Sequence, residues 1–589
     1  MRLLKKKHRS RNASPAAGSP FDLQSPQHLE QLNRLLAFSH TPQVSIHFEV
    51  LGEPPQTTTL RYPILQSPLE ALSSQTVSTS QAFAAPQAPS RLQVLPPDHV
   101  SLNPPINEVE PPIEYIYATG SYTKILINVA FARLLSHEKY KQFSLSWQTT
   151  ACDIFNEMRE RKGKSTILRL WGNPEIRQLL VHENGFAPMN RYLFAPDSTF
   201  IMSEDEFITV APLITEDFFK EKYPHRGWVQ YSNANHIFAG MVLEEVTGRK
   251  LHEVMHELVF EPLNMTHTIM DEQSLAVRTA GAVVVTGYRI SANKSQTTAT
   301  PNRYLSDVVE VAALGARSST QDIGKLNCAF LKGAEGERHC EFEREEIADF
   351  FHPYCKLRDG EWSTLGGLLS ALESEIASSE SLNSILLPRD FSPYTLGKRR
   401  DKSHCNAYYK AGSIDGFSSS VYFLLKDRAV VVVLGNSSGP LDVTDHIARY
   451  IIQEAFRLSP RVDIVSRAIE EGHICSERVQ SFERQDLRLS TFSDNVEDLV
   501  GTYQHVRYLQ QITITREGTV TIHGTAKTSS PMKLVRVSPK EVRILPGTSG
   551  FTIDRWSAWE ALDFTVDFES KSGICLVGNN GLDRYRWIR

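Results

Sequence analysis

Long apolar runs along the chain predict both helices and strands in one core. The runs at 125–135 and 234–248 have the length of buried helices, and the second ends in a glycine that is well placed to stop a helix. Farther along, apolar stretches at 414–425 and 429–434 flank the polar turn Lys426-Asp427-Arg428. This pattern is typical of a β-hairpin inside a buried sheet.

The pattern changes near the C-terminus, where short stretches alternate between apolar and polar residues. Residues 511–515 alternate and meet a second alternating stretch, 518–523, across the turn Arg516-Glu517. Three further short runs follow at 533–537, 542–545 and 563–568. Regularly spaced short strands predict a small antiparallel barrel or sandwich.

Shifts in composition divide the chain into segments. Residues 43–50 have the pattern of a strand, and residues 443–458 that of a helix closing the main domain. Residues 52–112 are rich in Pro, Ser, Thr and Gln, which predicts a surface excursion with little regular structure. We therefore expect a disordered basic tail over 1–28, a main domain over 29–459 with the insertion at 52–112, a connector over 460–496 and a barrel domain over 497–589.

The composition is that of a globular protein with a sizeable core. The 589 residues are 41% hydrophobic and carry a formal net charge of −5, which argues against general affinity for nucleic acid. Basic residues gather at 2–11, which we interpret as a solvated tail, with a localisation tag or membrane-surface contact as alternatives. No apolar region follows them, so we expect neither a secretory signal nor a membrane span. The seven cysteines are scattered and form no C-x-x-C pair, which favours reduced thiols and a cytoplasmic location.

Candidate chemistry begins at Ser121-Tyr122-Thr123-Lys124, directly before the first apolar run. Three residues apart on a helix, Ser121 and Lys124 project from nearly the same face. A desolvated lysine amine can take the proton of a serine hydroxyl and so make it nucleophilic, and the helix N-terminus favours negative charge at the serine. On its own, however, the tetrad is more simply a capping serine followed by a surface lysine.

A second motif, Tyr231-Ser232-Asn233, precedes the second apolar run. We expect Tyr231 and Asn233 on the loop that leads into that helix. A phenol near a lysine ammonium can lose its proton and serve as a base, and the Asn233 amide can hydrogen-bond a lysine or a substrate carbonyl. The alternative is a half-buried tyrosine beside a capping asparagine.

A third motif, Lys410-Ala411-Gly412-Ser413, enters the predicted hairpin. On an inner strand Lys410 can reach into a pocket, and Gly412 lets a substrate approach the backbone closely. The N–H of Ser413 can join that of Ser121 in an oxyanion hole. The alternative is an edge-strand lysine beside an ordinary turn.

Together, S-x-x-K, Y-S-N and K-x-G in this order resemble the serine β-lactamase-like superfamily, which includes class C β-lactamases, D-alanyl-D-alanine carboxypeptidases, D-aminopeptidases, esterases and fungal acyltransferases. The stretches 177–186, 261–268 and 314–323 also resemble this family, so the resemblance spans roughly residues 30–460. It implies an α/β fold of the α+β type, with an antiparallel sheet flanked by helices, an all-helical subdomain and then a lipocalin-like barrel.

The resemblance further implies a serine enzyme that transfers acyl groups. The catalytic residues would be Ser121, Lys124 and Tyr231, and the substrate and oxyanion would be held by Asn233, Lys410, Gly412 and Ser413. We expect a small-molecule acyl substrate from ester, thioester or amide chemistry, with hydrolysis and transfer both open and secondary metabolism as one setting. No metal or organic cofactor is implied, and assembly into a homo-oligomer stays open.

Two features depart from this family pattern. Ala411 replaces the threonine usual in K-T-G enzymes, which removes a hydroxyl that helps to bind a substrate carboxylate and makes penicillin-like substrates less expected. The segment between Gly185 and Tyr231 is long and rich in aromatic residues, which either shape an apolar acyl pocket or pack in the core. These residues are Tyr192, Phe194, Phe200, Phe207, Phe218, Phe219 and Trp228.

Two other functions remain open at this point. A non-catalytic relative would use the pocket for binding only. A zinc peptidase would use His252-Glu253-Val254-Met255-His256, because this H-E-x-x-H spacing places two imidazoles on one helix face with Glu253 as base. Two solvated histidines on a surface helix explain that motif more simply.

Overall fold

The structure is a computed structural model. It describes residues 21–63, 113–167, 170, 172–197, 199–222, 229–272, 274, 281–291, 294, 297–300, 311–337, 341–358, 361–372, 381, 383, 387–388, 391, 394–490, 496–505, 509–545, 563–569, 573–578 and 586–589. Residues 1–20, 64–112 and Trp228, for which the sequence also gives predictions, lie outside this part.

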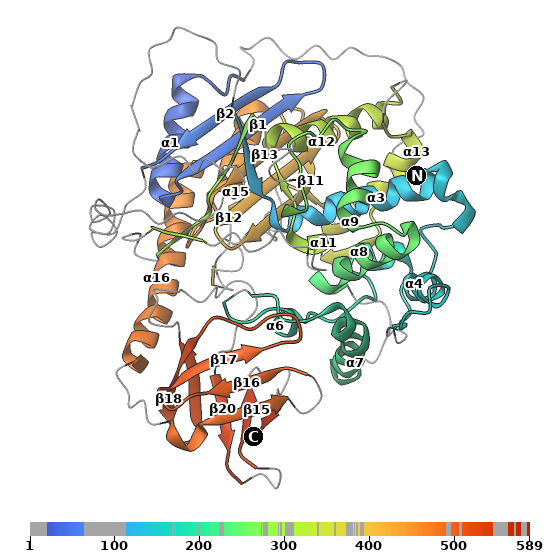
Figure 1. Cartoon of the computed structure of the whole chain (residues 1–589). Coiled ribbons are helices and arrows are strands. Elements are labelled where there is room, and N and C mark those ends of the chain that lie inside the picture. The colour runs from blue at the N-terminus through green and yellow to red at the C-terminus, as the bar shows by residue number, and fades with distance from the viewer. Residues whose placement is uncertain are drawn as a thin grey trace, which may run out of the picture.

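An eight-stranded antiparallel sheet forms the centre of the main domain, in the order β2-β1-β13-β12-β11-β10-β9-β8 (Figure 1). Its strands are β1 (Gln43–Val50), β2 (Gln56–Arg61), β8 (Cys355–Arg358), β9 (Glu361–Thr364), β10 (Gly367–Ala371), β11 (Asn406–Ile414), β12 (Phe417–Leu424) and β13 (Ala429–Gly435). The predicted hairpin is confirmed as β12 and β13, and the predicted strand at 43–50 is β1.

The central strands bury both faces because their side chains alternate between two apolar clusters. In β13, Val430 and Val432 belong to one cluster, whereas Val431 and Val433 belong to the other. This explains why the strand is apolar without a break: each residue enters one core or the other.

Three helices share the cluster that contains Val431, and two further helices, among others, share the cluster that contains Val430. The first three are α1 (Pro26–Ser39), α15 (Val443–Ala455) and α16 (Ile464–Ser490), and the other two are α3 (Thr123–Ser136) and α12 (Thr320–Glu335). The sheet is therefore covered by helices on both sides, as Figure 1 shows.

Further helices, together with α8 (Asn233–Thr247), complete the predicted helical subdomain. Its members are α4 (Ala151–Glu160), α5 (Ile176–Leu180), α6 (Asn190–Leu193), α7 (Glu204–Lys222), α9 (Leu251–Met255) and α11 (Val311–Leu314), and α13 (Arg344–Phe350) packs against α12. One-turn helices lie at η1 (Gly120–Tyr122), η2 (Glu138–Phe143), η3 (His256–Phe260) and η4 (Glu497–Leu499).

Two small sheets connect these layers. One has the order β4-β3-β7, formed by Ala282–Val284, Glu114–Ala118 and Arg317–Ser318. The other has the order β14-β5-β6, formed by Ser437–Ser438, Tyr288–Ile290 and Thr297–Ala299.

Two expected boundaries are wrong. The tail expected over 1–28 ends earlier, because Leu23 is fully buried and α1 already begins at Pro26, capped by the Ser25 hydroxyl. The insertion expected to be irregular over 52–112 contains β2, which extends the main sheet beside β1. The segment expected as a connector holds the 27-residue helix α16, which contacts α1 and α15.

The C-terminal strands close into an eight-stranded antiparallel barrel (Figure 1), as the alternating pattern predicted. The strands are β15 (Gly501–His505), β16 (Gln511–Ile514), β17 (Thr519–His523), β18 (Met532–Ser538), β19 (Glu541–Leu545), β20 (Asp563–Asp567), β21 (Cys575–Gly578) and β22 (Arg586–Ile588). In Figure 1 the helices α6 and α7 lie on the side of the main domain that faces the barrel.

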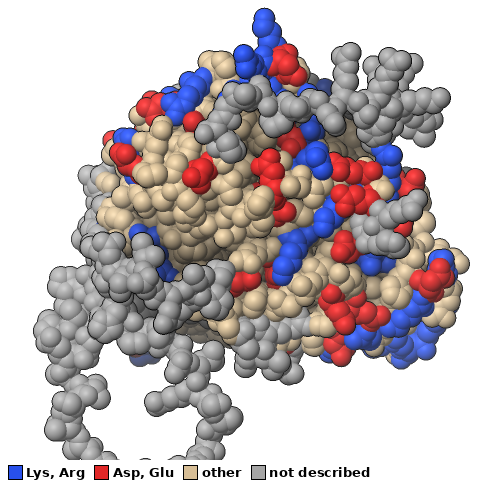
Figure 2. Space-filling model, turned by 90° about the horizontal axis from the view of Figure 1, so that it is seen from above, with Lys and Arg blue, Asp and Glu red and all other residues tan. Residues whose placement is uncertain are grey.

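The described surface carries mixed charge. Figure 2 shows one face on which Lys and Arg side chains lie among Asp and Glu side chains, in keeping with the small net charge of −5. Among the described residues, no helix has both the length and the hydropathy needed to cross a bilayer.

Candidate active site

The predicted nucleophile lies on a tight turn that leads into a buried helix. Ser121 belongs to the 3₁₀ turn η1, and α3 begins at Thr123, so the tetrad is split between the two elements. The Thr123 hydroxyl donates to the carbonyl of Gly120 at 2.7 Å and accepts from the Ala316 N–H at 3.0 Å. These bonds fix the turn from inside, which leaves Ser121 partly exposed beside a buried Lys124.

Two side chains hydrogen-bond the hydroxyl of Ser121. The Nζ of Lys124 donates to Ser121 Oγ at 3.2 Å and to the carbonyl of Ala313 at 2.8 Å. The Tyr231 hydroxyl lies 2.8 Å from Ser121 Oγ and donates to it. Residues 110 positions apart in sequence therefore meet at one oxygen, as the motifs predicted.

Two buried ammonium groups flank the ring of Tyr231. The Nζ of Lys124 lies 5.1 Å and the Nζ of Lys410 lies 5.0 Å from the ring centroid. Lys124 is 1% exposed and Lys410 is 6% exposed, so water screens both charges weakly. Two positive charges this close to the ring favour negative charge on the phenol oxygen, which is the state that a base requires. Tyr231 itself is 40% exposed, so its hydroxyl is open to an incoming molecule.

His182 packs beneath Tyr231, with 4.5 Å between the ring centroids. Its Nδ1 accepts the N–H of Ser232 at 3.3 Å and lies 3.1 Å from Nδ2 of Asn235. Burial, together with the charges of Lys410 and Lys124, holds the pKa of His182 well below its ordinary value of 6.5. The imidazole is therefore neutral and braces the tyrosine without adding a third cation. No motif signalled a role for His182, although it lies in the stretch 177–186 that resembles the family.

Asn233 is the first residue of α8, not a loop residue as expected. Its Nδ2 donates to Oδ1 of Asn190 at 2.9 Å. Its Oδ1 is buried and has no hydrogen-bond partner among the described residues. The expected bond between Asn233 and a lysine is not among the described contacts. Asn190, which bonds to Asn233 instead, is a site residue that no motif signalled.

Lys410 reaches the site from β11, where this strand extends past its neighbour. Strand β10 pairs only with residues 406–409, so the edge of β11 from Lys410 onward lies against the turn η1. A Cβ on Gly412 would lie 2.1 Å from the carbonyl oxygen of Thr119 and 2.5 Å from Oγ of Ser419. Gly412 therefore lets the strand approach the serine turn. Its role in close approach by a substrate stays a prediction.

The two expected oxyanion donors lie on these facing segments. A Cβ on Gly412 would be 3.1 Å from the Ser121 nitrogen, and a Cβ on Gly120 would be 2.8 Å from the Ser413 nitrogen. The turn and the strand are thus in van der Waals contact around both amides. Their joint use as an oxyanion hole stays a prediction.

The aromatic residues of the long segment pack in cores. Tyr192, Phe194, Phe200 and Phe207 are buried in the main apolar cluster, and Phe218 packs against Phe219 in a small one. The segment thus fits the packing alternative, and these residues do not mark an acyl pocket.

The alternative zinc motif lies elsewhere, on α9 and η3. His252, Glu253 and His256 line a hollow of about 230 Å³ together with Asp271, and Nδ1 of His256 lies 3.5 Å from a carboxylate oxygen of Glu261. Among the described residues, neither histidine belongs to a group of three ligand atoms close enough to share one ion.

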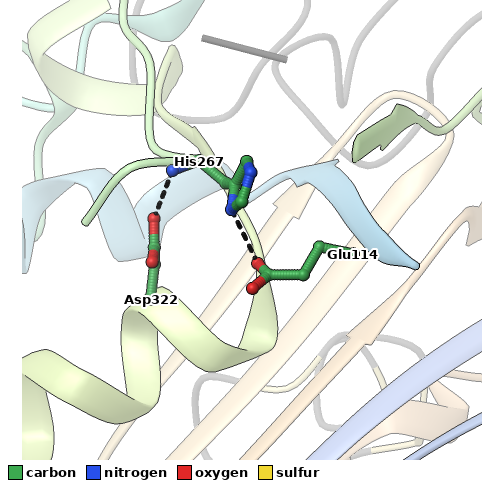
Figure 3. A group of neighbouring side chains, drawn as sticks. All are labelled: Glu114, His267 and Asp322. Carbon is green, nitrogen blue, oxygen red and sulfur yellow. Dashed lines mark hydrogen bonds and ion pairs between the residues drawn. The ribbon is translucent and has the colours of Figure 1, made fainter. Parts of the chain in front are cut away.

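Such a group exists only at Glu114, His267 and Asp322 within the described ranges (Figure 3). Asp322 accepts the backbone N–H of His267 at 2.7 Å and also pairs with Lys325 at 2.7 Å. Nδ1 of His267 lies 3.0 Å from Glu114. These contacts join β3, α12 and the loop that follows η3, which explains the cluster as a structural one.

Comparison with known proteins places this geometry in a family. Residues 116–456, more than half of the chain, match the family model described as Beta-lactamase. The chain belongs to the Beta-lactamase family. The predicted superfamily and fold class are thereby confirmed.

Individual relatives of this Beta-lactamase family member are distant. An unguisins hydrolase from Aspergillus campestris (strain IBT 28561) is 24% identical over 224 residues, which cover 37% of this chain and 38% of that protein. The match therefore spans well under half of the curated relative.

Two solved structures of similar proteins each share 16% sequence identity with this chain. An octameric penicillin-binding protein homologue from Pyrococcus abyssi has a TM-score of 0.46 and 16% identity, and the match covers 95% of this chain and 100% of that one. A class C β-lactamase from Rhodobacter sphaeroides has the same TM-score and identity, over 73% and 99% of the two chains.

Proposed function

We propose that the protein is a serine hydrolase that forms an acyl-enzyme at Ser121 with an ester, thioester or amide of a small molecule. The observation that carries this proposal is the meeting of Tyr231 Oη and Lys124 Nζ at Ser121 Oγ, at 2.8 and 3.2 Å. A serine hydroxyl needs a base within hydrogen-bond reach to become a nucleophile, and here two candidates lie within that reach.

In the proposed acylation step, Ser121 Oγ bonds to the carbonyl carbon and the carbonyl oxygen takes up the displaced electron pair. The hydroxyl proton passes to the phenolate oxygen of Tyr231 or to the amine of Lys124. In the geometry described, the Tyr231 hydroxyl donates to the serine, so proton removal requires the reverse direction. The two flanking ammonium groups, which favour the phenolate, support that reversal.

Collapse of the tetrahedral intermediate breaks the bond to the leaving group, which receives the same proton. The N–H groups of Ser121 and Ser413 would stabilise the oxyanion before collapse. Water then releases the acyl group from the serine, or an alcohol or amine does so in a transferase. Lys410 and Asn233 would hold the substrate, Lys410 by its charge and Asn233 through its side-chain amide.

The substrate class follows from chemistry and from one relative. The relative is named for hydrolysis of unguisins, which supports hydrolysis of a small natural product here. Ala411 supports a substrate other than a penicillin, because the position lacks a hydroxyl for a carboxylate.

The test is covalent labelling of the purified full chain with a fluorophosphonate probe, followed by intact-mass measurement. We expect one adduct in the wild type, no adduct in Ser121→Ala, and an unchanged adduct in the control Ser136→Ala, which changes a serine at the far end of α3. A folded wild type without an adduct, or a labelled Ser121→Ala, would sink the proposal. A panel of p-nitrophenyl esters, acyl thioesters and D-amino-acid amides, with and without an added amine, then separates hydrolysis from transfer.

A further inference from the structure

The C-terminal barrel is joined to the main domain by buried polar contacts. Asp197 is fully buried and accepts the backbone N–H of Ser530 at 2.7 Å. Glu206 is 2% exposed and accepts the N–H of Leu509 at 3.2 Å. A buried carboxylate that loses such partners pays a large desolvation cost, so these bonds define how the two parts fit.

Backbone contacts tighten the same interface. The N–H of Ala526 donates to the carbonyl of Ile201 at 2.9 Å, and the N–H of Ser203 donates to the Thr525 hydroxyl at 2.9 Å. A Cβ on Gly524 would lie 2.0 Å from that same Ile201 oxygen. The barrel turn is thus fitted to the segment 197–206 at backbone distance, where only glycine is tolerated.

One barrel contact reaches the helix that borders the active site. The side-chain amide of Gln510, which is 3% exposed, donates to the carbonyl of Tyr192 at 2.7 Å. Tyr192 lies in α6, which has only four residues, and so short a helix does not hold its own position in water. The anchors around it decide where it lies.

The first residue of α6 belongs to the active site. Asn190 accepts the amide hydrogen of Asn233 at 2.9 Å, and Asn233 stands beside Tyr231 at the start of α8. A continuous chain of contacts therefore runs from Gln510 through Tyr192 and α6 to Asn190, and from there to Asn233.

We propose that the barrel is a positioning element of the active site: Gln510 holds α6, and Asn190 thereby fixes the side-chain amide of Asn233 beside Tyr231. This inference rests on the proposed function. It also narrows the substrate class, because a side-chain amide at this position favours an acyl group that carries a hydrogen-bonding group near its carbonyl. The barrel then determines selectivity for that group and leaves the nucleophile itself unchanged.

The sequence offers a matched control for this test. Gln510 and Gln511 are neighbours, but Gln511 is exposed and its amide bonds to Gln504 inside the barrel. We compare Gln510→Ala with Gln511→Ala by the rates of two p-nitrophenyl esters, an N-acetylglycine ester and a hydrocarbon ester of equal length. Labelling by the fluorophosphonate probe reports the nucleophile separately.

For Gln510→Ala we expect kcat/KM to fall about tenfold with the N-acetylglycine ester, the equivalent of one hydrogen bond of about 1.4 kcal/mol. For the same variant we expect less than about a twofold change in kcat/KM with the hydrocarbon ester and in the rate of probe labelling. For Gln511→Ala we expect less than about a twofold change in all of these rates. In an Asn190→Ala background, Gln510→Ala should have no further effect, because both changes break the same chain of contacts. Equal losses on both esters, or additive effects of the two changes, would overturn the inference.

Hydrogen exchange gives a readout that does not depend on turnover. Backbone amides of residues 190–206 should exchange faster in Gln510→Ala than in Gln511→Ala, because α6 loses an anchor. Unchanged exchange in this segment would also overturn the inference. If the probe does not label the wild type, the proposed function is refuted. If the probe labels the wild type but Gln510→Ala changes neither the ester rates nor hydrogen exchange, only the role of the barrel is refuted.

Discussion

The imidazole of His182 lies with its centroid 4.5 Å from that of the Tyr231 ring, and its Nδ1 accepts the backbone N–H of Ser232. His182 thus holds the tyrosine and the residue after it at once. The residue has φ of +63°, a conformation that costs energy for most side chains and favours asparagine among the alternatives. Strain of this kind persists only where the surrounding contacts impose it.

Replacing His182 tests whether it positions Tyr231. His182→Phe keeps an aromatic ring but removes the acceptor, so we expect labelling of Ser121 to slow by about ten- to a hundredfold, for a loss of roughly 1–3 kcal/mol. His182→Asn keeps an acceptor and tolerates positive φ, and it should recover part of the rate. Time courses of labelling by the fluorophosphonate probe, quenched at set times, give the labelling rates, and circular dichroism checks the fold. A folded His182→Phe with wild-type rate would show that the contact with Tyr231 is packing alone.

Lys124 and Lys410 should respond differently to replacement by arginine. Arginine keeps the charge but does not give up its proton in proteins. If Lys124 exchanges a proton with Ser121, Lys124→Arg should slow acylation by at least about a hundredfold, the usual contribution of a general base.

Lys410 is the matched comparison, because its ammonium lies 5.0 Å from the Tyr231 ring centroid, almost the same distance as that of Lys124. Lys410→Arg preserves the positive charge, so we expect a loss of only about tenfold, mainly in KM, for one disturbed hydrogen bond. Single-turnover kinetics with the best p-nitrophenyl ester measures both variants. Equal losses would mean that Lys124 acts by charge and does not carry a proton.

The main contacts of the site follow from sequence because each motif sits at the start of a predictable element. Ser121 and Lys124 precede an apolar run, so local pattern alone places them at the start of a helix, whereas Lys410 lies on β11, the strand before the predicted hairpin. That Tyr231 meets Ser121 requires the family resemblance, since local pattern says nothing of a contact across 110 residues.

The remaining site residues carry no local signal. Asn190 lies in a one-turn helix that the barrel contacts, and Gln510 is one of two adjacent glutamines that differ in burial and in hydrogen-bond partner. Burial and domain contact are properties of the assembled chain, so a single sequence does not reveal them. The early end of the N-terminal tail was missed for a similar reason: Leu23 is fixed by Gln56 of β2, a strand hidden in a polar segment.

Gly412→Ala should disable the site through geometry. The added methyl group would lie 2.1 Å from the Thr119 carbonyl, so strand β11 and the serine turn must separate. We expect a loss of about 1–3 kcal/mol in the free energy of unfolding and no detectable labelling of Ser121. Gly52→Ala is the control, because a Cβ there meets nothing within 4 Å although φ is +95°. Its labelling should match the wild type, and a labelled Gly412→Ala would refute the close-approach explanation.

The buried histidines predict a loss of stability on acidification. Burial, with the charges of the neighbouring site residues, holds the pKa of both His182 and His236 well below 6.5. A histidine whose pKa is lowered in the folded chain adds to the free energy of unfolding above pH 6.5. This contribution is lost as the pH falls below 6.5, because the unfolded chain then binds the proton before the folded chain does. The melting temperature should therefore decrease from pH 6.5 downward.

Other buried groups act in the opposite direction, so a variant must isolate the histidine contribution. Burial raises the pKa of Glu471 to about 7 and that of Asp445 to about 6, and their contribution is lost as the pH rises through those values. In His236→Gln, an amide can still donate to Asn128 Oδ1, which lies 3.0 Å from Nε2 of His236, but it does not titrate. We expect the gap between the melting curves of wild type and variant to shrink between pH 6.5 and pH 5. A constant gap for His236→Gln would mean that His236 takes up its proton at the same pH in the folded and the unfolded chain.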